Sequence, residues 1–349
     1  MTSRRDFFSI AAGTAGALLA GSSAFGQARR DVLVGSRDVS VVDMHAHCLI
    51  PEVGKLIEGT RFERPFPGFQ LLGPSRLDEM DQRGIDIQVL SMNVYWWYEA
   101  EQDLAHRVVR LHDEKLAEWC AMHPDRFTAL SSVALQFPEL AAEQLEYAVK
   151  ELGLRGASVG GHVQGESLSL PKFDPFWAKA EELDVPVFMH PLNADYLIPP
   201  DAWGKRADLG NIIGNPLEST IFLSRMIVDG TLDRFPGLKV CVAHGGGYLP
   251  SYLGRSEVAC DIRPGSDCQN KKPPSEYLKT QIVVDSMVFS QEGLRHLVEE
   301  VGAGQVVYGS DLPFNWPDTI DLIADSPHLT DAQKTAILGD NLKNLLRIA

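Results

Sequence analysis

The chain has 349 residues, and its 32 Lys and Arg against 47 Asp and Glu give a net charge of −15. An acidic chain repels the phosphates of nucleic acid, so a role in binding DNA or RNA is disfavoured. Hydrophobic residues make up 44% of the sequence, which excludes a mainly disordered or collagen-like chain. The length suits either one α/β barrel of roughly 250 residues with insertions or two ordinary domains.

The N-terminal segment has the pattern of an export signal. Arg4 and Arg5 precede a mildly apolar run over residues 9–21 that is rich in Ala and Gly. This pattern predicts a twin-arginine signal peptide over residues 1–28 and a periplasmic protein, with an irregular cytosolic N-terminus as the alternative. The run is too short to span about 20 residues of hydrocarbon, so stable membrane insertion is not expected.

After the leader, short runs of β-branched residues alternate with longer helical patterns, which is typical of βα units around a parallel sheet. Eight strands are predicted, at residues 40–44, 85–92, 127–133, 157–160, 185–189, 238–243, 281–285 and 305–309. Helices are predicted at residues 104–122, 138–152, 174–183 and 291–301, and a last one at 330–346 with Thr330 as its N-cap. Eight such units predict a single (β/α)8 TIM barrel over residues 36–349. A doubly wound sheet would have fewer strands and a Gly-rich phosphate turn, and no G-x-G-x-x-G follows any of these strands.

The chain has five cysteines, an odd number, so they cannot all pair in disulfides. They show no C-x-x-C spacing, so a cysteine-ligated zinc site is not expected. Cys260 and Cys268 flank a short loop that contains Pro264 and Gly265. A disulfide between these two cysteines in an oxidising periplasm and a pair of free thiols both fit the sequence.

The first predicted strand ends in an H-x-H pattern. His45 and His47 point to the same side because side chains alternate along a strand, and Met44 is expected on the opposite side. Two imidazoles that converge at the end of a barrel strand have few structural explanations. The pattern therefore favours metal ligands.

The same residue types follow three later strands. His190, His244 and Asp311 come at the ends of the fifth, sixth and eighth predicted strands, and all these ends meet at one rim of a barrel. Two unusually long connections, residues 48–73 and 191–215, leave from that rim. Buried polar groups each cost several kcal/mol unless they are paired or bind a metal, so the rim is the predicted active site.

Four segments of the chain, residues 42–47, 79–86, 238–247 and 309–314, resemble the amidohydrolase superfamily, in the branch of aminocarboxymuconate semialdehyde decarboxylase and the amidohydrolase-2 proteins. The resemblance spans essentially the whole chain after the leader. It implies one divalent metal ion, with zinc as the expected ion, since residues 155–162 lack the bridging lysine of two-metal members. The residues it implies as metal ligands are His45, His47, His190 and Asp311, and the catalytic residues are Asp311 and His244, the latter as the acid/base.

The resemblance also implies a carboxylic acid as substrate, bound by arginines whose geometry suits carboxylates. Arg255 would act from a neighbouring subunit, which makes the protein a homodimer, or is an ordinary surface arginine. The family has another carboxylate-binding arginine, and Arg64 fits its position, with Arg61 fitting nearly as well. Phe314 and residues 96–98 (Trp-Trp-Tyr) could wall an aromatic or conjugated substrate, although loop packing explains the 96–98 cluster equally well.

Other polar residues have two interpretations each. Asp285, at the end of the seventh strand, either orients a ligand or caps a helix. His162, after the fourth strand, either touches substrate or is structural. The remaining histidines fall on predicted helices or their ends and are expected to be solvated: His106, His112, His123, His296 and His328.

The predicted function is a metal-dependent, non-oxidative decarboxylase of a conjugated or aromatic acid. A hydrolase of the same superfamily, such as a lactonase or amidase, is the alternative, because a Lewis-acidic metal and a general base serve both reactions. A barrel that binds metal without catalysis is a third hypothesis. The predicted export to the periplasm argues against intermediates of cytosolic aromatic catabolism as the substrate.

Overall fold

The structure is a computed structural model that describes residues 29–92, 96–192, 194–204, 207–263 and 265–349. Residues 1–28, for which a signal peptide is predicted, lie outside the described residues. No helix in the described ranges is long and apolar enough to cross a membrane.

Parallel strands at eight positions close into a barrel. Consecutive positions pair in parallel register around the ring, from β3–β4–β5 through β6–β7–β10–β11–β12–β13. The strands are β3 (Val42–Cys48), β4 (Ile87–Met92), β5 (Phe127–Ala129) with β6 (Ser131–Ser132), β7 (Ala157–Val159), β10 (Val187–Met189), β11 (Val240–Val242), β12 (Ile282–Asp285) and β13 (Val306–Val307).

At two places the ring is closed by individual backbone hydrogen bonds and not by extended strand pairing. At Leu130, between β5 and β6, the chain changes partner: the N–H of Leu130 donates to Leu90 O, and that of Ser131 donates to Gly156 O. The first and last strands meet through the N–H of Met44, which donates to Tyr308 O at 3.0 Å. The predicted (β/α)8 barrel is therefore confirmed.

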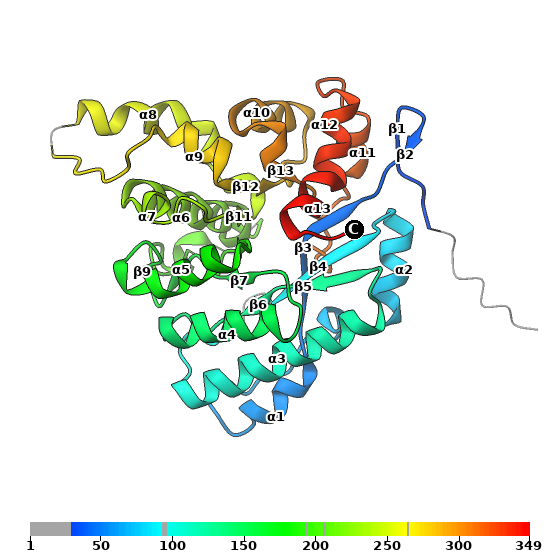
Figure 1. Cartoon of the computed structure of the whole chain (residues 1–349), viewed down its shortest axis with the longest axis vertical. Coiled ribbons are helices and arrows are strands. Elements are labelled where there is room, and N and C mark those ends of the chain that lie inside the picture. Colours follow the sequence, from blue (N-terminus) through cyan, green and yellow to red (C-terminus); the bar gives the residue numbers. More distant parts are fainter. Residues whose placement is uncertain (1–28, 93–95, 193, 205–206, 264) are drawn as a thin grey trace, which may run out of the picture.

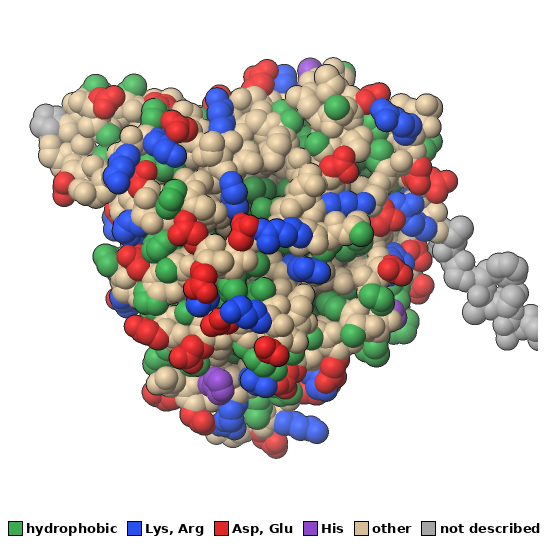
Figure 2. Space-filling model, in the orientation of Figure 1, with side chains coloured by type: hydrophobic (Ala, Val, Ile, Leu, Met, Phe, Trp, Pro, Cys, Tyr) green, Lys and Arg blue, Asp and Glu red, His purple; other side chains and the backbone are tan. Residues whose placement is uncertain are grey.

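Helices surround the strands, and two short hairpins lie outside the barrel, β1 (Leu33–Val34) with β2 (Arg37–Asp38) and β8 (His162–Val163) with β9 (Glu166–Ser167) (Figure 1). On the face shown in Figure 2, acidic and basic side chains are interspersed over the surface. The helices are α1 (Gly54–Ile57), α2 (Pro74–Arg83), α3 (Gln102–Met122), α4 (Pro138–Lys150), α5 (Asp174–Leu183), α6 (Asn215–Val228), α7 (Thr231–Arg234), α8 (Leu253–Ile262), α9 (Pro274–Thr280), α10 (Gln291–Val301), α11 (Ile320–Ala324), α12 (Asp331–Thr335) and α13 (Asn341–Leu346).

All eight predicted strands are present, mostly with shorter bounds. The first is shifted: it runs to Cys48 rather than ending at Met44, so both histidines of the H-x-H pattern lie within it. The last predicted helix is divided into α12, a π-helical turn at Ala336–Asp340 and α13. Its predicted cap is confirmed, because Thr330 and Gln333 form a capping box.

The apolar core has two layers. One fills the barrel itself, with side chains such as Val89, Phe188 and Val283, and it is closed from one end by Leu342 and Leu346 of α13. The larger layer lies between the outer faces of the strands and the surrounding helices. Both layers consist of buried apolar side chains, so the rim above them is a firm platform for polar side chains.

A bulge in β3 changes the direction of the side chains. Asp43 pairs with Gln88 and Ala46 pairs with Leu90, so β3 has one residue more than β4 over this stretch. Met44 consequently belongs to the barrel interior, as His45 does through its contact with Phe188. The prediction that Met44 points away from His45 is wrong, since simple alternation does not allow for the bulge.

His112 was expected to be solvated, and this prediction is also wrong. It lies on the inner face of α3 with an exposed fraction of 1%. Its Nδ1 lies 3.2 Å from Ser132 Oγ and 3.4 Å from a carboxylate oxygen of Asp113. The buried residues Val108, Val109 and Leu116 share this face, so the helical periodicity placed His112 in the core.

The structure decides between a disulfide and two free thiols at Cys260 and Cys268. Cys260, on α8, and Cys268 form a disulfide in the structure, whereas Cys48 and Cys241 are free and buried. The bond joins the end of α8 to the segment that leads to α9.

Candidate metal centre

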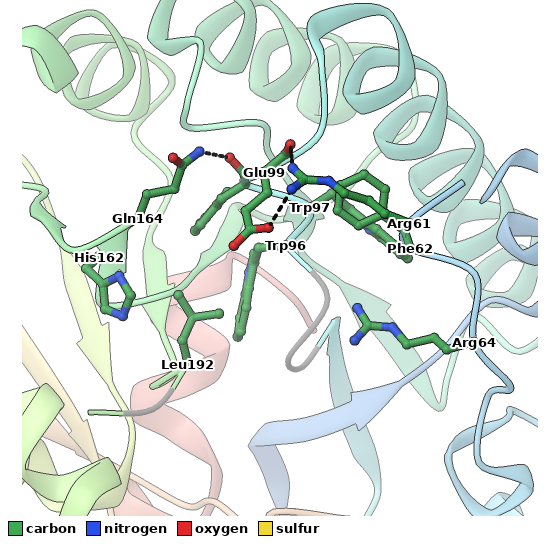
Figure 3. Close-up of a pocket in the computed structure, with 10 residues that line it drawn as sticks. Arg61, Phe62, Arg64, Trp96, Trp97, Glu99, His162, Gln164 and Leu192 are labelled. Atoms are coloured by element: carbon green, nitrogen blue, oxygen red, sulfur yellow. Dashed lines mark hydrogen bonds and ion pairs between the residues drawn. The ribbon is translucent and has the colours of Figure 1, made fainter. Parts of the chain in front are cut away.

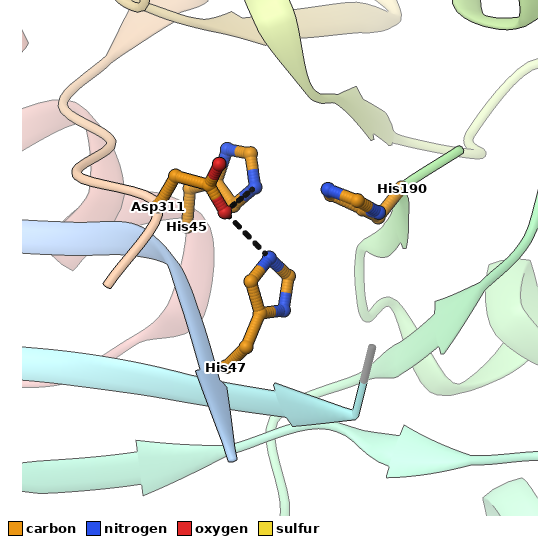
Figure 4. Close-up of side chains that lie close together, drawn as sticks. All are labelled: His45, His47, His190 and Asp311. Atoms are coloured by element: carbon orange, nitrogen blue, oxygen red, sulfur yellow. Dashed lines mark ion pairs between the residues drawn. The ribbon is translucent and has the colours of Figure 1, made fainter. Parts of the chain in front are cut away.

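Three histidines and an aspartate from three barrel positions converge at the rim (Figure 4). His45 and His47 come from β3, His190 directly follows β10, and Asp311 follows β13. One donor atom from each of the four residues lies within 4.8 Å of all the others, and all four residues are buried. The structure thus brings together the four residues that the resemblance implies as ligands.

Each histidine is oriented through its Nδ1 atom, which leaves Nε2 available. The Nδ1 atom of His45 lies 2.6 Å from Asp285 Oδ2, and that of His47 lies 3.1 Å from Ser91 Oγ. The Nδ1 atom of His190 lies 2.9 Å from the carbonyl oxygen of Pro191. Such partners hold the ring orientation of metal-ligating histidines in proteins generally.

The donor set fits a divalent metal ion. The Nε2 atoms of His45 and His47 lie 3.3 Å and 3.1 Å from Asp311 Oδ1, and all three atoms are buried without a hydrogen bond of good geometry. Buried polar atoms without partners are costly, and a cation among them would satisfy all of them at once. Imidazole nitrogens with one carboxylate are ligands that suit zinc and similar divalent ions.

The electrostatics of the cluster divide the histidines into two kinds. Burial would lower the pKa of His45, but the carboxylates of Asp311 and Asp285 outweigh it and raise this pKa to about 10. Burial lowers the pKa of His47 to about 4 and that of His190 well below its usual range. Without a metal ion, His45 is therefore the cationic member of the cluster at neutral pH.

A buried carboxylate, Asp43, holds the ligand-bearing segments together. Its Oδ1 accepts the N–H of His45 and the N–H of Ser310, both at 3.0 Å. Its Oδ2 accepts Ser310 Oγ at 2.5 Å and Gln88 Nε2 at 2.9 Å. Because Ser310 precedes Asp311, this network fixes His45 and Asp311 relative to each other.

Asp285 contacts the centre from β12. It is fully buried, pairs with His45, and also accepts the N–H groups of His244 and Gly245 at 2.9 Å and 2.8 Å. Of the two interpretations of Asp285, the contacts match the one in which it orients a ligand.

His244 lies beside the four converging residues. Its ring centroid is 5.2 Å from those of both His45 and His190, and its Nδ1 is buried without a hydrogen bond. Burial, reinforced by His45, lowers its pKa. The backbone of His244 is left-handed, with φ of 58°, and the glycine at 247 could not carry a Cβ atom, which would lie 2.2 Å from Pro216 O. The glycines after His244 thus allow the close backbone approach that places its ring at the centre.

A cavity of about 300 Å³ opens directly on this centre and includes His190 and Asp311 in its lining. Phe314 forms part of its wall, and its ring lies 5.9 Å from that of His47. The predicted position of Phe314 at the site therefore agrees with the structure. The other lining residues are Pro191, Leu192, Asp208, Asn211, Asn215 and Trp316.

A second cavity, of about 450 Å³, shares Leu192 with the first, and Figure 3 shows its lining. Both candidate arginines line it: Arg61 is ion-paired with Glu99, and the Arg64 guanidinium lies 5.8 Å from the ring centre of Trp97. His162 and residues 96–98 also line this cavity. Trp96 stacks on His190 with ring centroids 6.3 Å apart, so the cluster both packs the loop and supports a metal-site histidine.

Arg255 is not brought to the centre by this chain. It lies exposed on α8, which extends away from the barrel in Figure 1, and it is absent from the lining of both cavities. A role across a subunit interface stays a prediction.

Sequence reasoning missed three polar residues of the smaller cavity, Asp208, Asn211 and Asn215. The long connection at residues 191–215 was the available signal, because unusually long loops at the catalytic rim commonly carry function. Nothing in the sequence distinguishes these three side chains from other polar loop residues.

The fold and the centre define the class of the protein: a (β/α)8 barrel with a three-histidine, one-carboxylate metal site at the rim of its strands. Residues 42–348 match the family described as Amidohydrolase. The chain belongs to this family, and the resemblance seen in its motifs is confirmed.

Two relatives and a solved structure illustrate the similarity. The chain is 33% identical over 279 residues to 2-amino-3-carboxymuconate-6-semialdehyde decarboxylase of Dictyostelium discoideum, covering 78% of this chain and 75% of that protein. It is 28% identical to gamma-resorcylate decarboxylase of Rhodococcus jostii, over 88% and 98% of the two chains. A dihydroxybenzoic acid decarboxylase from Polaromonas, solved with bound manganese and the inhibitor 2-nitroresorcinol, aligns at a TM-score of 0.74 with 26% identity, over 88% and 97%.

The affinity of the centre for a divalent metal should rise with pH. His45 has a pKa of about 10 without metal and must lose a proton to coordinate, whereas His47, with a pKa of about 4, is already neutral. One displaced proton corresponds to about a ten-fold change per pH unit, or about 100-fold from about pH 6 to about pH 8. Competition with a chelator of known protonation would measure the change, and an affinity independent of pH would contradict this account.

Replacing Asp285 should weaken metal binding. The Asp285→Asn side chain keeps its size but loses the charge that faces His45 Nδ1, and loss of such a partner typically lowers metal affinity about 10- to 100-fold. Metal content after dialysis against graded chelators measures the effect. Asp325→Asn, an exposed carboxylate after α11, is the control and should leave the affinity unchanged. Equal affinities in the two variants would show that Asp285 does not support the centre.

Proposed function

We propose that this protein is a metal-dependent, non-oxidative decarboxylase, a carboxy-lyase, that acts on a conjugated or aromatic carboxylic acid. The observation that carries the proposal is the convergence of His45, His47, His190 and Asp311 around one metal position, with His244 beside them. The chain-long similarity to proteins named as decarboxylases supports this reaction over others.

A divalent metal ion held by the four residues would supply Lewis acidity that orients the substrate and stabilises developing negative charge. Decarboxylation breaks one carbon–carbon bond, releases carbon dioxide and requires one proton at the carbon that loses the carboxylate. We assign the movement of this proton to His244. Its ring borders the centre without a competing hydrogen bond at Nδ1, and because its pKa is lowered, a proton that it takes up from solvent would be readily transferred.

The remaining site residues would bind and orient the acid. Phe314 provides an apolar face for a conjugated or aromatic ring next to the metal position. Arg64, or Arg61, would attract an anionic substrate into the adjoining cavity. Arg255 is proposed to contact the substrate from a second copy of the chain in a homodimer.

We propose zinc as the ion, since three imidazoles favour it, although a similar solved structure holds manganese. Elemental analysis of the purified protein decides between them.

We also propose that the protein is exported by the twin-arginine route. The arginine pair before a mild apolar run supports this, and the Cys260–Cys268 disulfide suits an oxidising compartment. The N-terminus of the protein recovered from the periplasm should begin after residue 28. An intact N-terminus in the cytoplasmic fraction alone would overturn the proposal.

The metal-loaded protein should release carbon dioxide from a member of a panel of aromatic and conjugated acids that includes 2,6-dihydroxybenzoate. His244→Asn should lower this release by at least about 100-fold while the metal content stays unchanged. Asparagine suits the test because it tolerates the left-handed backbone at this position.

The control variant is His106→Asn, an exposed histidine on α3, which should keep full turnover. The alternative, a lactonase or amidase, would use the same ligand set: lactone hydrolysis releases acid that a pH-stat detects, and amide hydrolysis releases an amine. Release of acid from lactones or of an amine from amides, without any carbon dioxide from the panel, would favour the hydrolase. Metal binding without turnover of either kind would favour a binding protein.

A further inference from the structure

The cavity next to the metal centre has two unlike walls. One is apolar and aromatic, formed by Leu192, Phe314 and Trp316. The Trp316 ring is held by stacking on Phe289, with centroids 5.3 Å apart. The opposite chemistry comes from the 191–215 connection and the start of α6, which contribute Asp208, Asn211 and Asn215.

The backbone places these three polar side chains together. The carbonyl oxygen of Asp208 accepts the N–H groups of Asn211 and Ile212, at 2.9 Å and 3.0 Å, so Asp208 begins the turn. Asn211 lies in the π-helical turn at Gly210–Gly214, and Asn215 is the first residue of α6. Residues four apart on a helical segment lie on the same side, which brings both amides to the cavity.

The three polar groups are available to a ligand. In the part of the chain that the structure describes, no side-chain hydrogen bond or ion pair engages the Asp208 carboxylate or the amides of Asn211 and Asn215. An ionised carboxylate only accepts hydrogen bonds, whereas an amide both donates and accepts. This wall therefore suits a neutral or cationic hydrogen-bond donor.

The other cavity lined by Leu192 contains cationic side chains. Arg64 and the ion pair of Arg61 with Glu99 line it, and in Figure 3 His162 and Arg64 lie on opposite sides of it. A substrate at the centre would thus face arginines of the protein toward the second cavity, and a carboxylate and two amides of the protein toward Asp208.

We infer that Asp208, together with Asn211 and Asn215, is a specificity-determining residue that selects acids bearing a hydroxyl or amino group and rejects those with a second carboxylate at this end. The inference rests on the proposed function, because it takes the cavity to be the substrate site. A hydroxyl or amino group donates to the Asp208 carboxylate, whereas a carboxylate placed there is repelled by the like charge and leaves both acceptors unpaired.

The test uses two ligands that differ only in this respect, 2-nitroresorcinol and 2-nitroisophthalate, which has carboxylates in place of the hydroxyls. Their dissociation constants are measured by calorimetry on the metal-loaded protein, and the ratio of the two constants is compared between variants. Asp208→Asn removes the charge and should lower the preference for the hydroxyl ligand by about ten-fold, a modest effect because Asp208 is exposed and partly screened.

Asn211→Asp adds a charge to the same wall and should increase the preference. Asp201→Asn is the matched control, because Asp201 is an exposed carboxylate of the same connection that does not line the cavity. Higher salt should bring the ratios of the unsubstituted protein and of Asp208→Asn closer together, because salt screens the one charge by which they differ.

Several outcomes overturn the inference: an unchanged ratio in both Asp208→Asn and Asn211→Asp, a difference between the unsubstituted protein and Asp208→Asn that salt does not reduce, or failure of the unsubstituted protein to bind either ligand. Its failure is distinguishable from failure of the proposed function, which is measured by carbon dioxide release. Carbon dioxide release with unchanged ratios overturns only the assignment of Asp208. Shifted ratios without carbon dioxide release support that assignment and count against the decarboxylase.

Discussion

The metal centre depends on the way Asp43 joins the first and last barrel strands. Its buried carboxylate accepts hydrogen bonds from the backbone of His45, from both donors of Ser310 and from Gln88. Burial raises the pKa of this carboxyl group, and these four hydrogen bonds offset part of that cost. Two residues that are distant in the chain, His45 and Asp311, are thereby held at one point. The barrel must close before the centre exists, so the site and the fold form together.

The same constraint explains why the polar cluster can be buried at all. Three imidazoles and two carboxylates in a dry interior would be destabilising if each were left alone. Here the proton of His45 offsets one of the two negative charges of Asp285 and Asp311, and a divalent ion in place of that proton would offset both. Proton and metal therefore compete for one position, which ties the chemistry of the centre to pH.

The convergence of His45, His190 and Asp311 could be predicted from the sequence because parallel strands in a barrel end at one rim. Their assignment as metal ligands, with His244 set apart from them, came from the family resemblance. The direction of the Met44 side chain could not be predicted, because the bulge in β3 depends on the pairing of this strand with β4. His112 was misjudged although its helical periodicity was readable. Asp208 could not be assigned, because the conformation of a long connection depends on packing between loops that are far apart in sequence.

The two long connections give the rim its chemical asymmetry. The segment after β3 contributes Arg61 and Arg64, and the segment after β10 contributes Asp208 and Asn211, with Leu192 between the two cavities. On the proposed function, the strands would keep one metal geometry while these loops determine which substituents an acid can carry and which way it faces. The net charge of −15 says nothing about this choice, because cationic and acidic side chains meet within one site. On the proposed assignment, specificity would thus be a property of the two loops together, while the metal centre is a property of the strands.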